Sequence, residues 1–193
     1  MSEVTPPLTR IEIEARLNRD RAWLLETYAG LDERQLNTPV TPSEHDPETM
    51  WSAKDHFVHL ALIENNWVDM IRRFLAGDGD PVQLYKDGAG AERTREEVIA
   101  SVHKWTESWA RKNREATLNE AVAITQAARA RTLELLAEMT DEQLTLTVPK
   151  APWADGTAGG ILAANAGHGR MHFGFVRAGW AEKGIAWEGV ESG

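Results

Sequence analysis

The sequence contains no cysteine among its 193 residues, which excludes disulfide bonds and a protein thiol nucleophile. Any sulfur chemistry must therefore use a thiol that a cofactor or substrate supplies. The chain also has no run of about 18 apolar residues, and its first thirty residues contain no apolar signal-peptide core. The sequence thus favours neither membrane insertion nor secretion, and we expect a cytoplasmic protein.

Positive charge is scarce as well. The 21 Lys and Arg residues are outnumbered by 30 Asp and Glu residues, the formal net charge is −9, and the basic residues form no long stripe. Nucleic acids and anionic membranes bind basic faces, so we expect neither as a partner. The chain length, the 42% hydrophobic residues and the eight Trp residues instead suit one globular domain over residues 1–193.

Apolar residues recur at helical spacing in much of the chain. The predicted helical regions are Leu8–Tyr28, about Ala53–Leu75, Thr94–Thr140 and Ala158–Trp180. Capping boxes at Thr94 with Glu97 and at Thr117 with Glu120 favour a break near Ala116, although propensity alone also permits one long helix. Gly30 ends the first helix, and Ser52 with Asp55 caps the second.

Segments with the composition of loops separate these predicted helices. Met1–Pro7 is a polar lead-in, Leu31–Met50 contains three prolines, and the glycine-rich stretch 77–90 has no phosphate-binding pattern. The segments 31–36 and 139–144 resemble each other, and each leads through a proline-containing loop and a Trp to a helix N-cap, Ser52 or Thr157. This internal repeat predicts two helix pairs that pack as an antiparallel bundle, with His59 opposite Ala164.

Two histidines in the last predicted helix, His168 and His172, are four residues apart and therefore lie on one face, one turn apart. This spacing can chelate a metal ion, but Gly169 replaces the glutamate of zinc-protease motifs, so a protease is excluded. Two histidines leave a divalent ion under-coordinated. The candidate third donor is His59, which lies on an apolar, inward face of the second helix.

Other histidines receive different interpretations. His56, one turn before His59, is a rival donor or a supporting group, and we interpret it as a capping or solvent-edge residue. His103 is expected to be exposed rather than a ligand. Glu64 projects about 140° from His59 on a helical wheel, so no general base is predicted and the catalytic residues remain unknown.

Six glycines occur in Ala158–Trp180, each costing up to about 1 kcal/mol in helix propensity, so tertiary packing must hold this helix. The glycines would let helices approach around an ion, whereas simple close packing is the preferred explanation for Gly174 and Gly179. A predicted buried stripe follows helical spacing: Ile161, Asn165, His168, His172, Phe175 and Gly179. Asn165 is placed to hydrogen-bond a ligand or substrate.

These motifs in this order resemble the DinB-like superfamily of four-helix metalloproteins, which includes thiol-dependent maleylpyruvate isomerases and bacillithiol transferases. The matching pattern is Trp51-Ser52-x-Lys54-Asp55, His59-Leu60-Ala61, a helical middle and His168-x-x-x-His172. The resemblance spans roughly Leu8–Lys183 and implies an all-α antiparallel four-helix bundle with extra short helices and loops. It also implies that His59, His168 and His172 bind a divalent ion, zinc or nickel.

Three imidazoles on one ion leave an open coordination position, which is typical of catalytic zinc. The resemblance and the missing cysteine favour a metal-dependent S-transferase or isomerase that uses a low-molecular-weight thiol as cosubstrate and acts on a small molecule. Two alternatives stay open: a hydrolase that uses metal-bound water, and a non-catalytic bundle that binds a metal or ligand. Such family members are often dimeric, and the tryptophan content permits a homodimer.

Overall fold

The computed structural model of the protein describes residues 8–43, 45–87 and 89–189, so the predicted lead-in Met1–Pro7 lies outside the described residues. The chain forms seven helices and two short strands within these ranges, which confirms the all-α prediction. In order they are α1 Arg10–Ala29, α2 Glu33–Asn37, β1 Thr41–Pro42, β2 Met50–Trp51, α3 Ala53–Leu75, α4 Arg95–Asn113, α5 Leu118–Glu138, α6 Asp141–Thr145 and α7 Ala158–Glu182. No helix formed by the described residues is long and apolar enough to cross a membrane.

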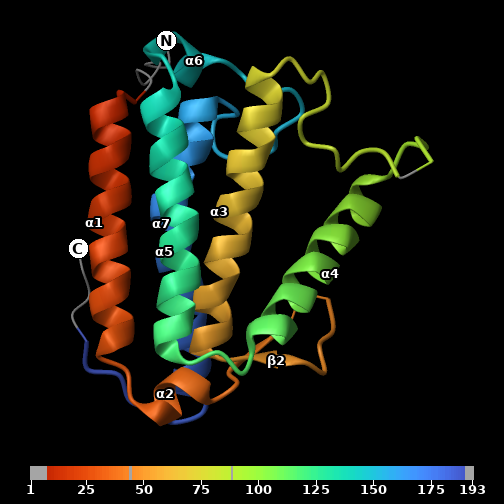
Figure 1. Ribbon diagram of the computed structural model, residues 1–193. Helices are drawn as coiled ribbons and strands as arrows, with labels where there is room; N and C mark the ends of the chain where they lie inside the picture. Colours follow the sequence, from red (N-terminus) through yellow and green to blue (C-terminus); the bar gives the residue numbers. More distant parts are fainter. Residues whose placement is uncertain (1–7, 44, 88, 190–193) are drawn as a thin grey trace, which may run out of the picture.

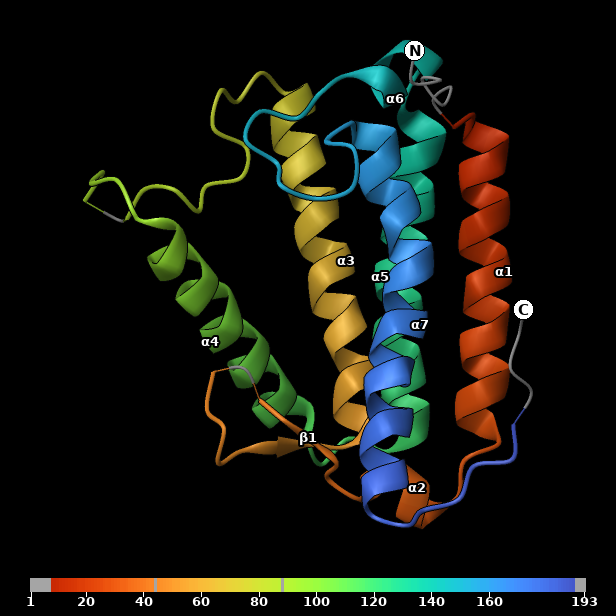
Figure 2. The ribbon, with the colours of Figure 1, turned by 180° about the vertical axis from the view of Figure 1, so that it is seen from behind.

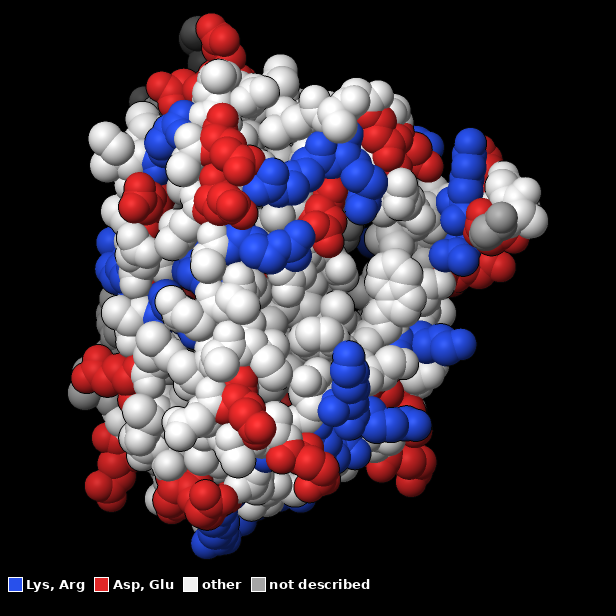
Figure 3. Space-filling view, in the orientation of Figure 1, with Lys and Arg blue, Asp and Glu red and all other residues white. Residues whose placement is uncertain are grey.

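Four helices, α1, α3, α5 and α7, lie side by side as a bundle (Figures 1 and 2). Helices α1 and α7 run in one direction and α3 and α5 in the other, so two pairs are antiparallel to each other. Helix α4 belongs to the long connection from α3 to α5 and leans away from the bundle. A space-filling view shows a hollow between the bundle and α4 (Figure 3).

The predicted helix boundaries follow from capping side chains. Capping boxes begin α3, α4 and α5 at Ser52, Thr94 and Thr117, as the sequence predicts. In each box the hydroxyl accepts a backbone N–H and the acidic side chain three residues later accepts the N–H of the cap itself. The favoured break between α4 and α5 is confirmed, because α4 ends at Asn113 and α5 begins at Leu118.

The internal repeat is visible in the structure. Helices α2 and α6 each have five residues and begin with a capping box that uses glutamine, Gln35 or Gln143. Backbone pairing then follows in both halves, between β1 and β2 in the first half and between Thr147 and Thr157 in the second. The segment 31–50, predicted as loop, therefore contains a helix and a strand, because short elements held by caps leave no periodic signal.

Two glycines of α7 allow close approach. A Cβ at Gly169 would lie 2.6 Å from Leu24 Cδ1 of α1, and a Cβ at Gly179 would lie 2.4 Å from the carbonyl oxygen of Val40, just before β1. Close packing is thus confirmed for Gly179. The same explanation is wrong for Gly174, whose Cβ would meet no described atom within 4 Å.

Replacing Gly179 with alanine is expected to lower the free energy of unfolding by about 1–3 kcal/mol, because the segment around Val40 must move. Gly174→Ala is the matched control, since it should stabilise the helix by up to about 1 kcal/mol. Chemical denaturation of both variants measures the difference. Equal effects would contradict the packing that we describe at Gly179.

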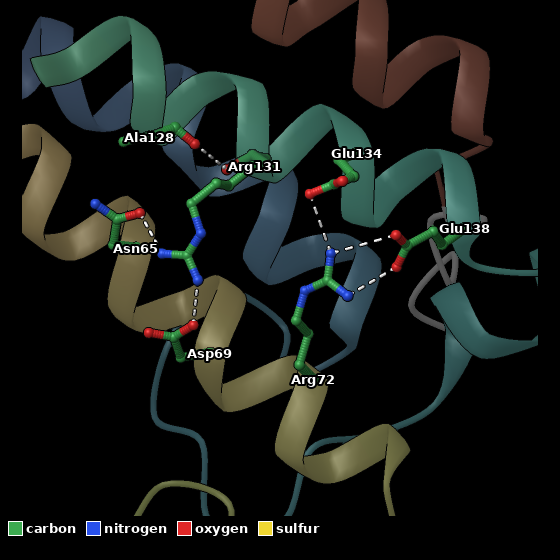
Figure 4. Close-up of polar contacts among 8 residues, drawn as sticks. Asn65, Asp69, Arg72, Ala128, Arg131, Glu134 and Glu138 are labelled. Carbon is green, nitrogen blue, oxygen red and sulfur yellow. Dashed lines mark hydrogen bonds and ion pairs between the residues drawn. The ribbon is translucent and has the colours of Figure 1, made fainter.

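Polar contacts join the parallel neighbours α3 and α5. On the surface, Arg131 of α5 bonds Asn65 and Asp69 of α3, and Arg72 of α3 pairs with Glu134 and Glu138 of α5 (Figure 4). These groups are largely hydrated, so each pair contributes little, about 0–1 kcal/mol.

A buried ion pair lies deeper in the same interface. Arg129 of α5 donates from Nε to Glu64 Oε1 at 2.6 Å and from Nη1 to the carbonyl of Leu17 at 2.5 Å. Arg129 and Glu64 are 4% and 5% exposed, so water cannot replace either partner if the other is lost. The pair therefore links α1, α3 and α5.

Candidate metal centre

A cavity of about 670 Å³ lies between α3, α4, α7 and the β1–β2 hairpin. Helix α3 brings His59 to it, and α7 brings His168 and His172. One nitrogen from each of these three rings lies within 4.8 Å of the others. Residues more than a hundred positions apart thus meet because α3 and α7 pack against each other in the bundle.

The ring nitrogens of His168 and His172 face each other directly, with their Nε2 atoms 3.0 Å apart. Two zinc–nitrogen bonds of about 2.05 Å at a tetrahedral angle would hold their nitrogens about 3.3 Å apart. His59 completes the cluster, with its ring centroid 4.6 Å from that of His172. The geometry of the cluster is therefore close to what one small divalent ion requires.

All three rings are kept neutral by their surroundings. Burial lowers the pKa of His59 to about 3, with the neighbouring His168 and His56 adding to the effect, and it lowers the pKa of His168 to about 4. Burial, and then the nearby His59, lower the pKa of His172 even further. A metal ion binds only the neutral imidazole, so these rings present free lone pairs at neutral pH.

An unpaired buried atom also fits a metal. Nδ1 of His59 is buried and has no hydrogen-bond partner within the described part of the chain. A buried polar atom without a partner costs about 1–3 kcal/mol, so its retention calls for an explanation, and a role in binding an ion is one. The donor set, three neutral imidazoles in a pocket, suits zinc or nickel. The residues present therefore fit a divalent ion.

A fourth histidine supports the cluster. His56 Nδ1 lies 2.9 Å from His172 Nδ1, and His56 Nε2 contacts the hydroxyl of Thr41. If His172 offers its Nε2 lone pair to an ion, its Nδ1–H donates to His56 Nδ1, and His56 Nε2–H then donates to Thr41 Oγ1. The Thr41 hydroxyl can in turn donate to the carbonyl of Trp51, 3.4 Å away. Each donor in this series of hydrogen bonds, from His172 to the carbonyl of Trp51, then has an acceptor.

The interpretation of His56 as a solvent-edge residue is therefore wrong. Its side chain is 5% exposed and points into the site. The sequence contains a signal for this position, namely the spacing of His56 to His59. Residues three apart lie on neighbouring parts of one helix face, so His56 points partly inward when His59 points inward. The hairpin and α7 then close over it.

Replacing His56 with alanine is expected to weaken zinc binding about 10- to 100-fold, because groups that orient a metal-bound histidine contribute on that scale. Competition titration against a zinc chelator measures the affinity. His56→Gln, which keeps a hydrogen-bonding group, should recover part of it. An unchanged affinity in His56→Ala would mean that the hydrogen-bond chain does not support the site.

The other residues considered for the site agree with the predictions only in part. His103 of α4 is half-buried and lines the cavity, so the expectation of an exposed side chain is wrong. Asn165 is buried and its Nδ2 has no partner among the described residues. Glu64 faces Arg129, which agrees with its rejection as a general base. Phe175 is 48% exposed at the cavity mouth and does not continue a buried stripe.

The lowered pKa values predict how the stability of the metal-free protein depends on pH. A histidine in the unfolded chain has a pKa near 6.5. In the native state burial lowers the pKa of His56 to about 4 and that of His59 to about 3, so between about pH 6.5 and 4 the unfolded state binds more protons. The buried histidines therefore lower the free energy of unfolding as the pH falls through this window, and the pKa of Asp20, raised by burial to about 6, offsets only part of this loss.

Thermal denaturation of metal-free protein at pH 7.5, 6.0 and 5.0 should show this loss. His59→Leu should reduce the slope, because it removes one of the buried imidazoles. The exposed Ile11, replaced by alanine, is the control and should leave the slope unchanged, because its side chain does not titrate. A melting temperature that is constant across this range would contradict the prediction.

A comparison with known proteins identifies the family to which the chain belongs. The sequence model of the DinB superfamily matches residues 45–176. The chain belongs to the DinB superfamily. The match includes His59, His168 and His172. No curated protein matches the chain.

A solved structure has the same fold. The crystal structure of an uncharacterised protein from Escherichia coli UTI89 superposes with a TM-score of 0.57 over 94% of this chain and 98% of that chain. The two sequences are only 16% identical, so the similarity concerns the fold alone. The DinB superfamily assignment and the histidine cluster together fit a metal-binding protein.

Proposed function

We propose that this DinB superfamily protein is a metal-dependent enzyme that transfers or isomerises a small molecule with the help of a low-molecular-weight thiol. His59, His168 and His172 hold one divalent ion, zinc or nickel. The observation that carries the proposal is the convergence of three neutral imidazoles on a cavity of about 670 Å³ that is large enough for a substrate. A closed structural metal site would need no such cavity.

A bound divalent ion would supply a Lewis acid that lowers the pKa of a thiol or of water. The chain itself supplies three things. His59, His168 and His172 would hold the ion, His56 and Thr41 would orient His172, and the walls of the cavity would surround the substrate. Since the sequence has no cysteine, a thiol must come from outside.

The side chains that line the cavity favour a thiol rather than water as the nucleophile. The only carboxylate that lines the cavity, among the described residues, belongs to Glu182, which is exposed. Hydrolysis by metal-bound water commonly uses a carboxylate next to the ion as general base. A thiol has a reference pKa near 8.5, so it can be deprotonated by a much weaker base than water requires. We therefore favour thiol chemistry over hydrolysis.

Activity assays of zinc- and nickel-loaded protein separate the alternatives. An activated aryl halide should be consumed only when 2-mercaptoethanol is present, and His172→Ala should abolish the reaction. Ester cleavage that ignores the thiol would contradict the proposal and indicate a hydrolase. Loss of thermal stability on metal removal, with no turnover of thiols, electrophiles or esters, would indicate a non-catalytic metal-binding bundle.

A further inference from the structure

We propose that the cavity selects small molecules that have one metal-binding head and an uncharged, apolar body, and that it discriminates against bodies that carry a carboxylate. The inference rests on the proposed function, because it names the substrate class of the same site. It concerns both the thiol and its reaction partner, since both would occupy this cavity.

Each element that forms the cavity contributes at least one apolar side chain to its walls, beside the polar side chains of Thr41, Ser43, His103 and Thr106. Helix α3 contributes Ile63, α4 contributes Val102, and α7 contributes Met171 and Phe175. The hairpin adds the indole ring of Trp51. Ligand sites with such walls bind mainly by removing apolar surface from water, at about 25 cal/mol per Å².

Two of these large apolar side chains are exposed to solvent, although burial would be energetically favourable for them. Met171 and Phe175 are 50% and 48% exposed, and they lie one turn apart at the mouth of the cavity. Large apolar side chains that remain exposed beside a concave site are typical of surfaces that a ligand or partner covers. An apolar ligand body in the cavity would cover them, whereas a hydrated, charged body would not.

Charge is nearly absent from the lining. Among the described lining residues, Glu182 at the end of α7 is the only Asp, Glu, Lys or Arg. A carboxylate on the ligand body would lose water without gaining a cationic partner, and it would approach the negative Glu182. The divalent ion would bind the anionic head directly, whereas a carboxylate at the far end of the body would lie away from the ion and nearer to Glu182. Thiols with carboxylate-bearing bodies are therefore disfavoured.

Three benzyl thiols test this selectivity, with methyl, carboxylate or aminomethyl at the 4-position. Isothermal titration calorimetry of metal-loaded protein gives each dissociation constant. The methyl compound should bind at least about tenfold more tightly than the carboxylate, a factor that matches one unpaired polar group. The aminomethyl compound should also bind more tightly than the carboxylate. Equal or tighter binding of the carboxylate, or no measurable binding of any of the three, would overturn the proposal.

A charge-reversal variant isolates the role of Glu182. Glu182→Lys should reduce the ratio between the methyl and carboxylate compounds several-fold. Glu142→Lys on α6 makes the same change in net charge at the opposite end of the bundle and should leave the ratio unchanged (Figure 1). A shift in Glu142→Lys as large as that in Glu182→Lys would overturn the assignment of selectivity to the cavity mouth.

The design separates this inference from the proposed function. Binding is measured without turnover, so selective binding in a protein with no catalytic activity would support the inference while the proposed reaction fails. If the protein holds no metal, the corresponding benzyl alcohols can be titrated into the protein as purified. The same order of affinities would then support the inference, and a preference for the carboxylate would overturn it.

Discussion

Replacing His172 with alanine is expected to lower the affinity for zinc at least about 100-fold. Structural zinc sites with four ligands have apparent binding free energies of about 10–16 kcal/mol, so one ligand accounts for roughly 3 kcal/mol. His172 also joins the other groups, because its two nitrogens contact His168 and His56. Its loss therefore removes a ligand and disconnects His56 from the site.

Metal analysis of purified protein, combined with competition titration, measures this effect. The wild-type protein should carry about one equivalent of divalent metal per chain. His103→Ala is the matched control, because His103 lines the same cavity but lies outside the group of three. Circular dichroism shows whether each variant keeps its helices. Full metal retention in a folded His172→Ala variant would exclude the proposed ligand set.

Replacing Arg129 with methionine should destabilise the protein by about 3–5 kcal/mol, because the carboxylate of Glu64 would remain buried without its partner. The carbonyl of Leu17 would lose a donor at the same time. This is the largest effect on stability that we expect from a single substitution away from the metal centre. Denaturation with urea at pH 7 measures it.

Two variants control for this prediction. Arg131→Met removes a partly exposed pair with Asp69 and should cost less than about 1 kcal/mol. The double variant Glu64→Leu with Arg129→Met removes both buried charges and should recover much of the lost stability. A loss in Arg129→Met no larger than that in Arg131→Met would mean that the buried pair does not hold these helices together.

Features encoded by neighbouring residues were predictable from the sequence. The bounds of α3 follow from its capping box and from the glycine after it, and the break before α5 follows from the capping box at Thr117. The cluster of three histidines was also accessible, because the inward face of α3 and the spacing on α7 each restrict where a ring can point. The family resemblance supplied the link between them.

Features that depend on how elements pack were not predictable in this way. Helical periodicity assigns Phe175 to the same face as His168 and His172, yet Phe175 is 48% exposed and lines the cavity on the side of α4, which leans away from the bundle (Figure 2). The tilt of α4 likewise turns His103 into a lining residue. His56 becomes part of the site because it contacts both Thr41 of the hairpin and His172 of α7. Its spacing to His59 indicates a partly inward direction, but no local sequence signal specifies these packing contacts.

The position of the metal itself tests the central claim most directly. Crystals of zinc-loaded protein, with diffraction collected at the zinc absorption edge, should show one anomalous peak bonded to a nitrogen of His59, His168 and His172 at about 2.0–2.1 Å. A remaining coordination position should face the cavity. A peak bound by other side chains, or the absence of any peak among these three rings, would contradict the account.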